Sequence, residues 1–296
     1  MNPAESKVPN VGGFLLGAPK CGTSWLSDAL AQHPGISVSN PKEPNIVATH
    51  KGTFGRSNIE PDWSNYANCF QGNGLKIDCS VHAFACPIAP KRIFENWPNS
   101  KFIICLREPV SRTVSHWNMI LDTNEDKENG EDWSDFKLAW EDPRLNCDTL
   151  YGASVSRWLE YFEKESLLII EAHRLRHEPL VVLNEVCEHL GVSSHSFDLG
   201  AVHNTNSASD RRPITLFGQV FRFAASLLPN FIKGRIVKKL QARGTNVYKM
   251  PILSSEAPPK REISEREREI LAPEVNADLS ILEDLVGFDA SKWRIK

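Results

Sequence analysis

The stretch GAPKCGTSWL, residues 17–26, combines residue types that bind an anion. It follows a short apolar run and opens a helical pattern. A strand that leads through a glycine-bounded turn into a helix points several backbone N–H groups at one place, where the helix dipole also favours negative charge. Lys20 adds a positive charge inside the turn. Thr23 and Ser24 add two hydroxyls at the helix start, and Trp25 adds a flat surface for a base. The stretch predicts a site for an anionic nucleotide.

The two glycines of this stretch, Gly17 and Gly22, have the spacing of the nucleotide-triphosphatase loop G-x-x-x-x-G-K-[ST]. Thr23 stands where the lysine of that loop would follow the second glycine, and Lys20 lies within the turn instead. A tight turn without a ligand is the alternative interpretation of this spacing.

A second candidate anion site follows the apolar run at residues 101–106, which has the character of a buried parallel strand. The run ends in Arg107, and Pro109 then starts a helix. Ser115 is two helical turns beyond Glu108 on a similar face, so the hydroxyl and the Arg107 guanidinium are expected to converge. The alternative is a surface arginine paired with Glu108 and a serine that serves only the helix.

These two segments resemble the donor-binding motifs of the sulfotransferases that use 3′-phosphoadenosine-5′-phosphosulfate (PAPS). GAPKCGTSWL is similar to their 5′-phosphosulfate loop, and REPVSRTVSHW, residues 107–117, to their 3′-phosphate motif. The resemblance covers nearly the whole chain and weakens at residues 45–74 and 213–259. It implies one domain over residues 1–296 with an α/β fold of three layers, in which helices cover both faces of a central parallel sheet. This is the architecture of the P-loop-containing nucleotide hydrolases, and residues 213–259 would form a helical insertion on the acceptor side or the surface.

The resemblance also implies the reaction, in which the sulfo group moves from PAPS to an acceptor hydroxyl or amine and leaves 3′-phosphoadenosine-5′-phosphate (PAP). Lys20 would stabilise the leaving phosphate, and no metal is expected because a sulfo group carries less charge than a phosphoryl group. A late pair of arginines matches the position of the family's basic loop, although the glycine of that loop is absent. The implied donor-binding residues are Lys20, Cys21, Gly22, Thr23, Ser24, Trp25, Arg107, Ser115, Arg211 and Arg212.

Two residues are candidates for the base that removes the acceptor proton. Glu43 resembles the catalytic glutamate in the K-E-x segment of the glycosaminoglycan sulfotransferases, although Ile46 and Val47 replace the aromatic pair that usually follows. That assignment favours a carbohydrate acceptor. His82 resembles the histidine base of the cytosolic enzymes and favours a small-molecule or lipid alcohol.

Two interpretations from other classes of protein stay open. One is a kinase-like phosphotransferase, which would need Asp78 or Glu171 to hold magnesium. The other is a nucleotide-binding scaffold that has lost its catalytic activity.

The composition of the chain indicates which kinds of binding partner to expect. The chain has 296 residues, 41% of them hydrophobic, and a formal net charge of −3, which argues against general nucleic-acid binding. No apolar run approaches the length of a membrane span, and the polar start lacks the core of a secretory signal, so a cytoplasmic location is expected. Residues 213–249 combine apolar and basic positions, which predicts either a helix packed on the core or an amphipathic surface that touches a membrane.

The seven cysteines are an odd number without a C-x-x-C pair, so reduced thiols are expected. Cys21 is interpreted either as a small residue that fills the turn or as a reactive thiol with a lowered pKa.

Alternating patterns of apolar strands and helices favour a parallel sheet covered on both faces. Ligands of such sheets bind beyond the carboxyl ends of the strands, where both the Lys20 turn and Arg107 fall. The acidic stretch at residues 122–132 is expected to be a solvated loop, or a loop beside the acceptor. Gly191 is expected to end the last helix before residue 200. The predicted strands are 13–16, 75–79, 101–106 and 167–171, and the predicted helices 23–32, 110–121, 148–163 and 180–190.

Overall fold

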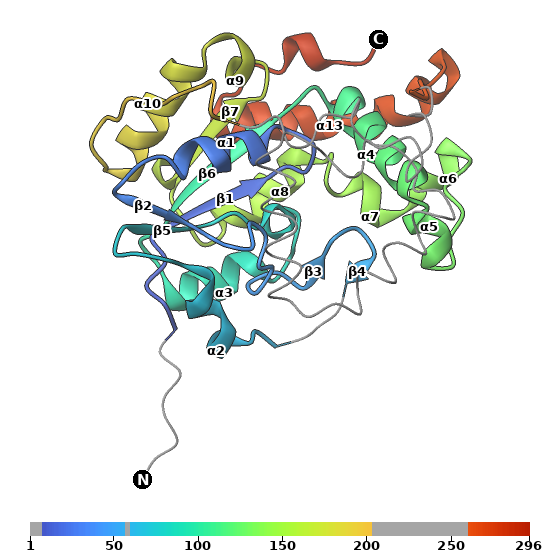
Figure 1. Cartoon of the computed structure of the whole chain (residues 1–296). Helices are drawn as coiled ribbons and strands as arrows, with labels where there is room; N and C mark the ends of the chain where they lie inside the picture. The colour runs from blue at the N-terminus through green and yellow to red at the C-terminus, as the bar shows by residue number, and fades with distance from the viewer. Residues whose placement is uncertain (1–7, 57–59, 203–259) are drawn as a thin grey trace.

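The computed structural model describes residues 8–56, 60–202 and 260–296 (Figure 1). Its centre is a parallel sheet of five strands in the order β2-β5-β1-β6-β7. The strands are β1 Gly13–Gly17, β2 Ile36–Val38, β5 Leu75–Asp78, β6 Lys101–Leu106 and β7 Leu167–Glu171. Every residue of β1 is buried, as expected for the central strand of a sheet that is covered on both faces.

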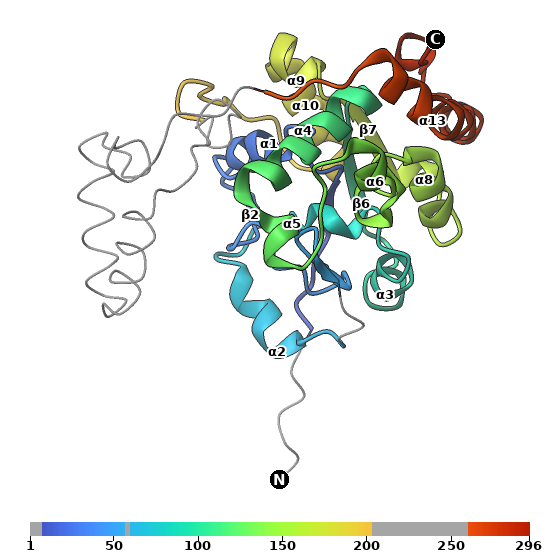
Figure 2. The same cartoon turned by 90° about the vertical axis from the view of Figure 1, so that its right-hand side faces the viewer.

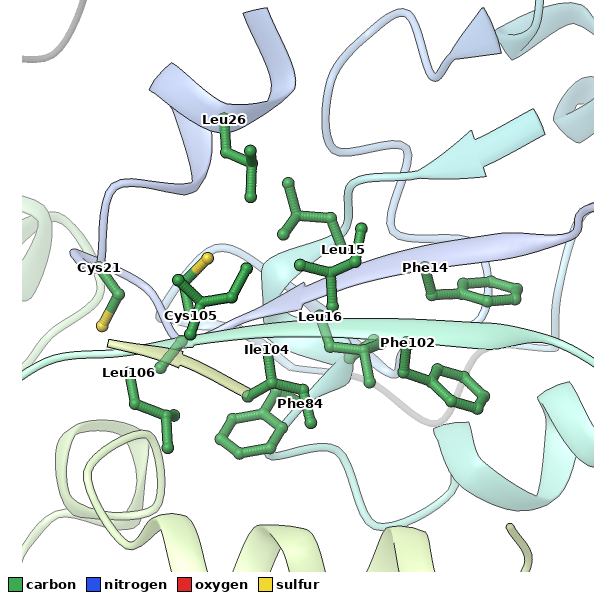
Figure 3. Packing of buried hydrophobic residues seen from close by; sticks show 14 of the residues in the cluster. Phe14, Leu15, Leu16, Cys21, Leu26, Phe84, Phe102, Ile104, Cys105 and Leu106 are labelled. Atoms are coloured by element: carbon green, nitrogen blue, oxygen red, sulfur yellow. The ribbon is translucent and has the colours of Figure 1, made fainter. Parts of the chain in front are cut away.

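Helices cover both faces of this sheet, which confirms the predicted three-layer α/β architecture. α1 (Thr23–Leu30) and α10 (Pro179–Leu190) contact the strands from one face, and Figure 2 places α8 (Tyr151–Leu159) on the opposite side from α1. Trp158 of α8 packs on Phe102 of β6, with 4.9 Å between ring centroids. Figure 3 shows Leu26 of α1 on one side of β1 and Phe84 on the other. α13 (Glu265–Val286) lies outside α8 as a further layer.

Shorter elements complete the described chain. The carboxyl end of β5 leads into the 3₁₀ turn η2, which contacts β1. A two-stranded antiparallel hairpin, β3 with β4, lies between β2 and α2 in the sequence. These elements are β3 His50–Lys51, β4 Gly55–Arg56, α2 Trp63–Tyr66, η1 Ala67–Cys69, η2 Val81–Ala83, α3 Ala89–Asn96, α4 Pro109–Thr123, α5 Glu125–Glu128, α6 Phe136–Glu141, α7 Pro143–Asn146, η3 Lys164–Ser166, α9 Arg174–His177 and η6 Ser291–Trp293.

The four predicted strands and the four predicted helices are present, with differences at their ends. Gly191 adopts a φ of 70° and ends α10, as predicted. α8 begins three residues later than predicted. Asp148 and Thr149, which precede it, are buried, and the Thr149 hydroxyl contacts that of Thr113 at 2.8 Å. The edge strand β2 and the helix α13 were not predicted.

The expectation of a solvated acidic loop at residues 122–132 is wrong in part. α4 continues to Thr123, and Asp126 in α5 is 1% exposed because its carboxylate accepts the backbone N–H of Trp133 at 3.0 Å. The predictions for residues 213–249 and 213–259 lie outside the described residues. None of the helices in the described ranges combines the length and the apolar character that a membrane span needs.

Candidate active site

The turn between β1 and α1 has the backbone that the glycine spacing predicts. Gly22 adopts a φ of 87° directly before α1, which suits glycine. At Gly17 a Cβ atom would lie 2.8 Å from the carbonyl oxygen of Val81, so glycine lets η2 pack against the start of the turn. Lys20 has a φ of 72°, an uncommon conformation for a residue with a side chain. The turn therefore holds Lys20 in a fixed place ahead of the α1 N-terminus.

The Lys20 side chain reaches across to α4. Its Nζ lies 3.6 Å from the Sδ of Met119, which is one helical turn beyond Ser115 on the same face of α4. Lys20 and Ser115 are both partly exposed. The structure therefore brings the two predicted anion sites to one edge of the sheet.

Arg107 follows β6 directly, and its backbone is fixed from α8. The Tyr151 hydroxyl donates a hydrogen bond of 2.8 Å to the Arg107 carbonyl. Glu108 does not pair with Arg107, because its carboxylate caps α4 by accepting the N–H groups of Val110 and Ser111 at 2.9 and 2.7 Å. Within the part of the chain that the structure describes, no hydrogen bond or ion pair engages the Arg107 guanidinium, so it remains accessible to an anion.

Cys21 lies inside the turn and is 1% exposed. Burial raises the pKa of its thiol to about 11, while the nearby charges of Arg112 and Arg107 act in the opposite direction. The interpretation of Cys21 as a reactive thiol with a lowered pKa is therefore wrong, and Cys21 fills the turn. Arg107 therefore lies close enough to the turn for its charge to act on the Cys21 thiol.

Both candidate bases lie near the carboxyl end of β5. Glu43 is about one-third exposed and forms an ion pair of 2.7 Å with the adjacent Lys42. The Ser80 hydroxyl accepts the backbone N–H of Asn45 at 2.9 Å, so the segment that carries Glu43 rests on the start of η2. His82, in η2, is only 7% exposed. Glu43 is thus the more accessible of the two side chains.

Two features of this site were missed in the sequence. The Lys42 ammonium lies near the carboxyl end of β5: burial raises the pKa of the Cys79 thiol to about 11, and the Lys42 charge opposes that rise. Tyr151 fixes the backbone of Arg107. Both relations join residues far apart in the chain, and no local pattern signals them.

The remaining predicted donor-binding residues differ in how far they are exposed. Thr23 is buried at the first position of α1, whereas Ser24 and Trp25 are partly exposed on its first turn. Arg211 and Arg212 lie outside the described residues. Among the described side chains, no group of three His, Cys, Asp or Glu residues could hold a metal ion.

A turn of this kind, at the carboxyl edge of a parallel sheet, is typical of the P-loop-like fold. Residues 13–209 match the model of the sulfotransferase domain, so the chain belongs to that family. The resemblance seen in the sequence is thereby confirmed.

Comparison with individual proteins agrees with this assignment. The chain is 29% identical over 201 residues to the mouse (Mus musculus) bifunctional heparan sulfate N-deacetylase/N-sulfotransferase 4, a match that covers 62% of this chain and 22% of the relative. It is 28% identical over 182 residues to human (Homo sapiens) heparan sulfate glucosamine 3-O-sulfotransferase 5, a match that covers 58% of this chain and 51% of the relative. The chain therefore spans about half or less of the length of these relatives.

A solved structure supports the fold. The sulfotransferase from Alicyclobacillus acidocaldarius aligns with a TM-score of 0.64 and 22% identity, over 97% of this chain and 99% of that one.

Proposed function

We propose that this sulfotransferase moves the sulfo group of PAPS to a hydroxyl or amine of a carbohydrate or glycoconjugate, and releases PAP. The observation that carries the proposal is the accessible Arg107 guanidinium beside the Lys20 turn. PAPS carries a 5′-phosphate and a 3′-phosphate on its ribose, so Lys20 would meet the first and Arg107 the second. The similarity to heparan sulfate sulfotransferases favours a carbohydrate acceptor.

In the proposed reaction, an acceptor oxygen or nitrogen attacks the sulfur as the bond between sulfur and the 5′-phosphate oxygen breaks. Lys20 and the N–H groups of the turn offset the charge that develops on that oxygen. Thr23 and Ser24 hold the 5′-phosphate, and Trp25 stacks on the adenine. Arg107 and Ser115 hold the 3′-phosphate, together with Arg211 and Arg212 from the late basic segment. Such a transfer depends mainly on alignment and charge, as loose phosphoryl transfer does.

Glu43 is the proposed base that takes the acceptor proton. Its exposure exceeds that of His82, and it lies at the carboxyl edge of the sheet where the donor would bind. The second candidate function, transfer to a small-molecule or lipid alcohol, would use His82 instead. A phosphotransferase is disfavoured by the membership in the sulfotransferase family.

The test uses radiolabelled PAPS with three acceptor classes: desulfated glycosaminoglycan chains, phenols and lipid alcohols. We expect transfer to the glycosaminoglycan chains. Glu43→Gln should lower turnover about a hundredfold or more, the scale of losing a general base, with PAP affinity retained. His82→Ala should cost much less. Transfer to phenols or lipid alcohols alone, with the reverse order of the two variants, would contradict the carbohydrate proposal and support the second candidate.

A further inference from the structure

A chain of buried polar side chains runs beneath α4. Arg112 is fully buried, and its Nη2 donates to the carbonyl of Leu145 at 3.1 Å. Its Nη1 lies 3.7 Å from the carboxylate of Asp148, which is 1% exposed. A buried guanidinium is costly unless it is paired, and these two contacts hold the Arg112 side chain in place.

His116 continues this chain on the next turn of α4. Its Nδ1 lies 3.2 Å from Arg112 Nη1, and its Nε2 lies 2.8 Å from the Thr53 hydroxyl. Because a guanidinium only donates hydrogen bonds, Nδ1 must accept. Asp148 Oδ2 lies 3.7 Å from both Arg112 Nη1 and His116 Nδ1, which is too far for a hydrogen bond to the ring nitrogen. With Nδ1 accepting, a neutral ring carries its hydrogen on Nε2 and donates a hydrogen bond to the Thr53 hydroxyl. Arg112 thus donates to His116 and His116 donates to Thr53, which joins α4 to the turn between β3 and β4.

Other contacts fix the same turn against the segment that follows α4. The Phe54 ring lies 5.0 Å from that of Trp133, and the Arg144 guanidinium lies 4.6 Å from the Phe54 centroid. These two ring contacts anchor the turn, and the Thr53 bond links it to α4 itself.

We propose that His116 is a positioning residue that couples the donor site to the β3–β4 hairpin. The inference rests on the proposed function, because Ser115, the proposed 3′-phosphate ligand, directly precedes His116 in α4. Glu43, the proposed base, lies seven residues before His50 at the start of the hairpin. Binding of the donor to Ser115 fixes α4, and the buried bond from His116 to Thr53 transmits that constraint to the acceptor side.

The test measures hydrogen exchange of the backbone amides at residues 50–56 with and without PAP, and PAP affinity by calorimetry. Thr53→Val removes the hydroxyl and keeps the shape of the side chain, and Thr53→Ser is the matched control that keeps the hydroxyl. We expect PAP to slow exchange in the wild type and in Thr53→Ser by about tenfold, the scale of one buried hydrogen bond. In Thr53→Val that response should be lost while PAP affinity is retained. His116→Gln, which offers both a donor and an acceptor, should preserve the response.

The outcomes separate the inference from the proposed function. PAP that binds the wild type without slowing exchange at the hairpin overturns the inference alone. A Thr53→Val variant that melts at a lower temperature but keeps the full response also overturns it, because the bond would then be structural only. Wild-type protein that does not bind PAP contradicts the proposed function, and the inference falls with it. The wild-type comparison requires no variant, so a variant that fails to fold does not block the test.

Discussion

At the scale of single residues, the site depends on two cations that reach one edge of the sheet from different elements. Lys20 comes from the turn after β1 and Arg107 from the end of β6, and the contact of Lys20 with Met119 connects them through α4. Arg107 is partly exposed, and none of the ion pairs among the described residues engages its guanidinium. A cation that stays accessible in this way can meet a ligand instead of stabilising the fold.

Replacing Lys20 tests its role in the transition state. Lys20→Ala should lower kcat about a hundredfold, because one oriented donor to the developing charge is lost, whereas PAP affinity should fall by less. Steady-state kinetics with radiolabelled PAPS and calorimetry with PAP measure the two effects. Lys101→Ala is the matched control, since Lys101 begins β6 at the opposite end of that strand. Nearly normal turnover in Lys20→Ala would remove Lys20 from catalysis.

At the scale of elements, sequence patterns predicted the strands and helices that create the site, because those patterns are local. The apolar runs of β1 and β6 and the Pro109 start of α4 are examples. β2 was missed because three residues form no clear pattern, and α13 because its many charges and an internal proline, Pro273, obscure its apolar positions. The contacts Asn45 with Ser80 and Thr53 with His116 join distant segments, so no local pattern could predict them.

The carboxyl end of β5 gives a prediction on stability. Asp78 is 1% exposed and accepts hydrogen bonds from the Tyr66 hydroxyl at 2.6 Å and the Ser80 N–H at 2.7 Å. Burial raises the pKa of Asp78, so the folded state holds the proton more tightly than the unfolded chain does. The stability that this proton contributes is present at low pH and is lost as pH rises through the raised pKa.

The measurement compares the wild type with Asp78→Asn by urea unfolding, from a pH below the ordinary pKa of an aspartate up to neutral pH. An amide can still accept from Ser80 and donate to Tyr66, and it does not titrate. The free energy of unfolding of the wild type, relative to Asp78→Asn, should therefore fall with rising pH. Asp78→Ala should lose about 3 kcal/mol, because it leaves two buried donors unsatisfied. A difference between wild type and Asp78→Asn that is independent of pH would contradict this account.

At the scale of the whole molecule, the five-stranded sheet gathers the segments that the function requires. The turn after β1, the segment that carries Glu43, η2 and the start of α4 all lie near the carboxyl ends of β5, β1 and β6, the three central strands. This arrangement allows a donor to lie along the sheet edge with an acceptor beside it. The whole-chain similarity to a solved sulfotransferase fold agrees with such an organisation.

This edge of the sheet is expected to bind a nucleotide through both a 5′- and a 3′-phosphate. Calorimetric titration with PAP and with adenosine 5′-phosphate tests it directly, since the two ligands differ only in the 3′-phosphate. We predict that PAP binds about a hundredfold more tightly, the scale of two charge-assisted hydrogen bonds, and that Arg107→Ala removes most of this difference. Equal affinity for the two nucleotides, or no binding of either, would contradict the account.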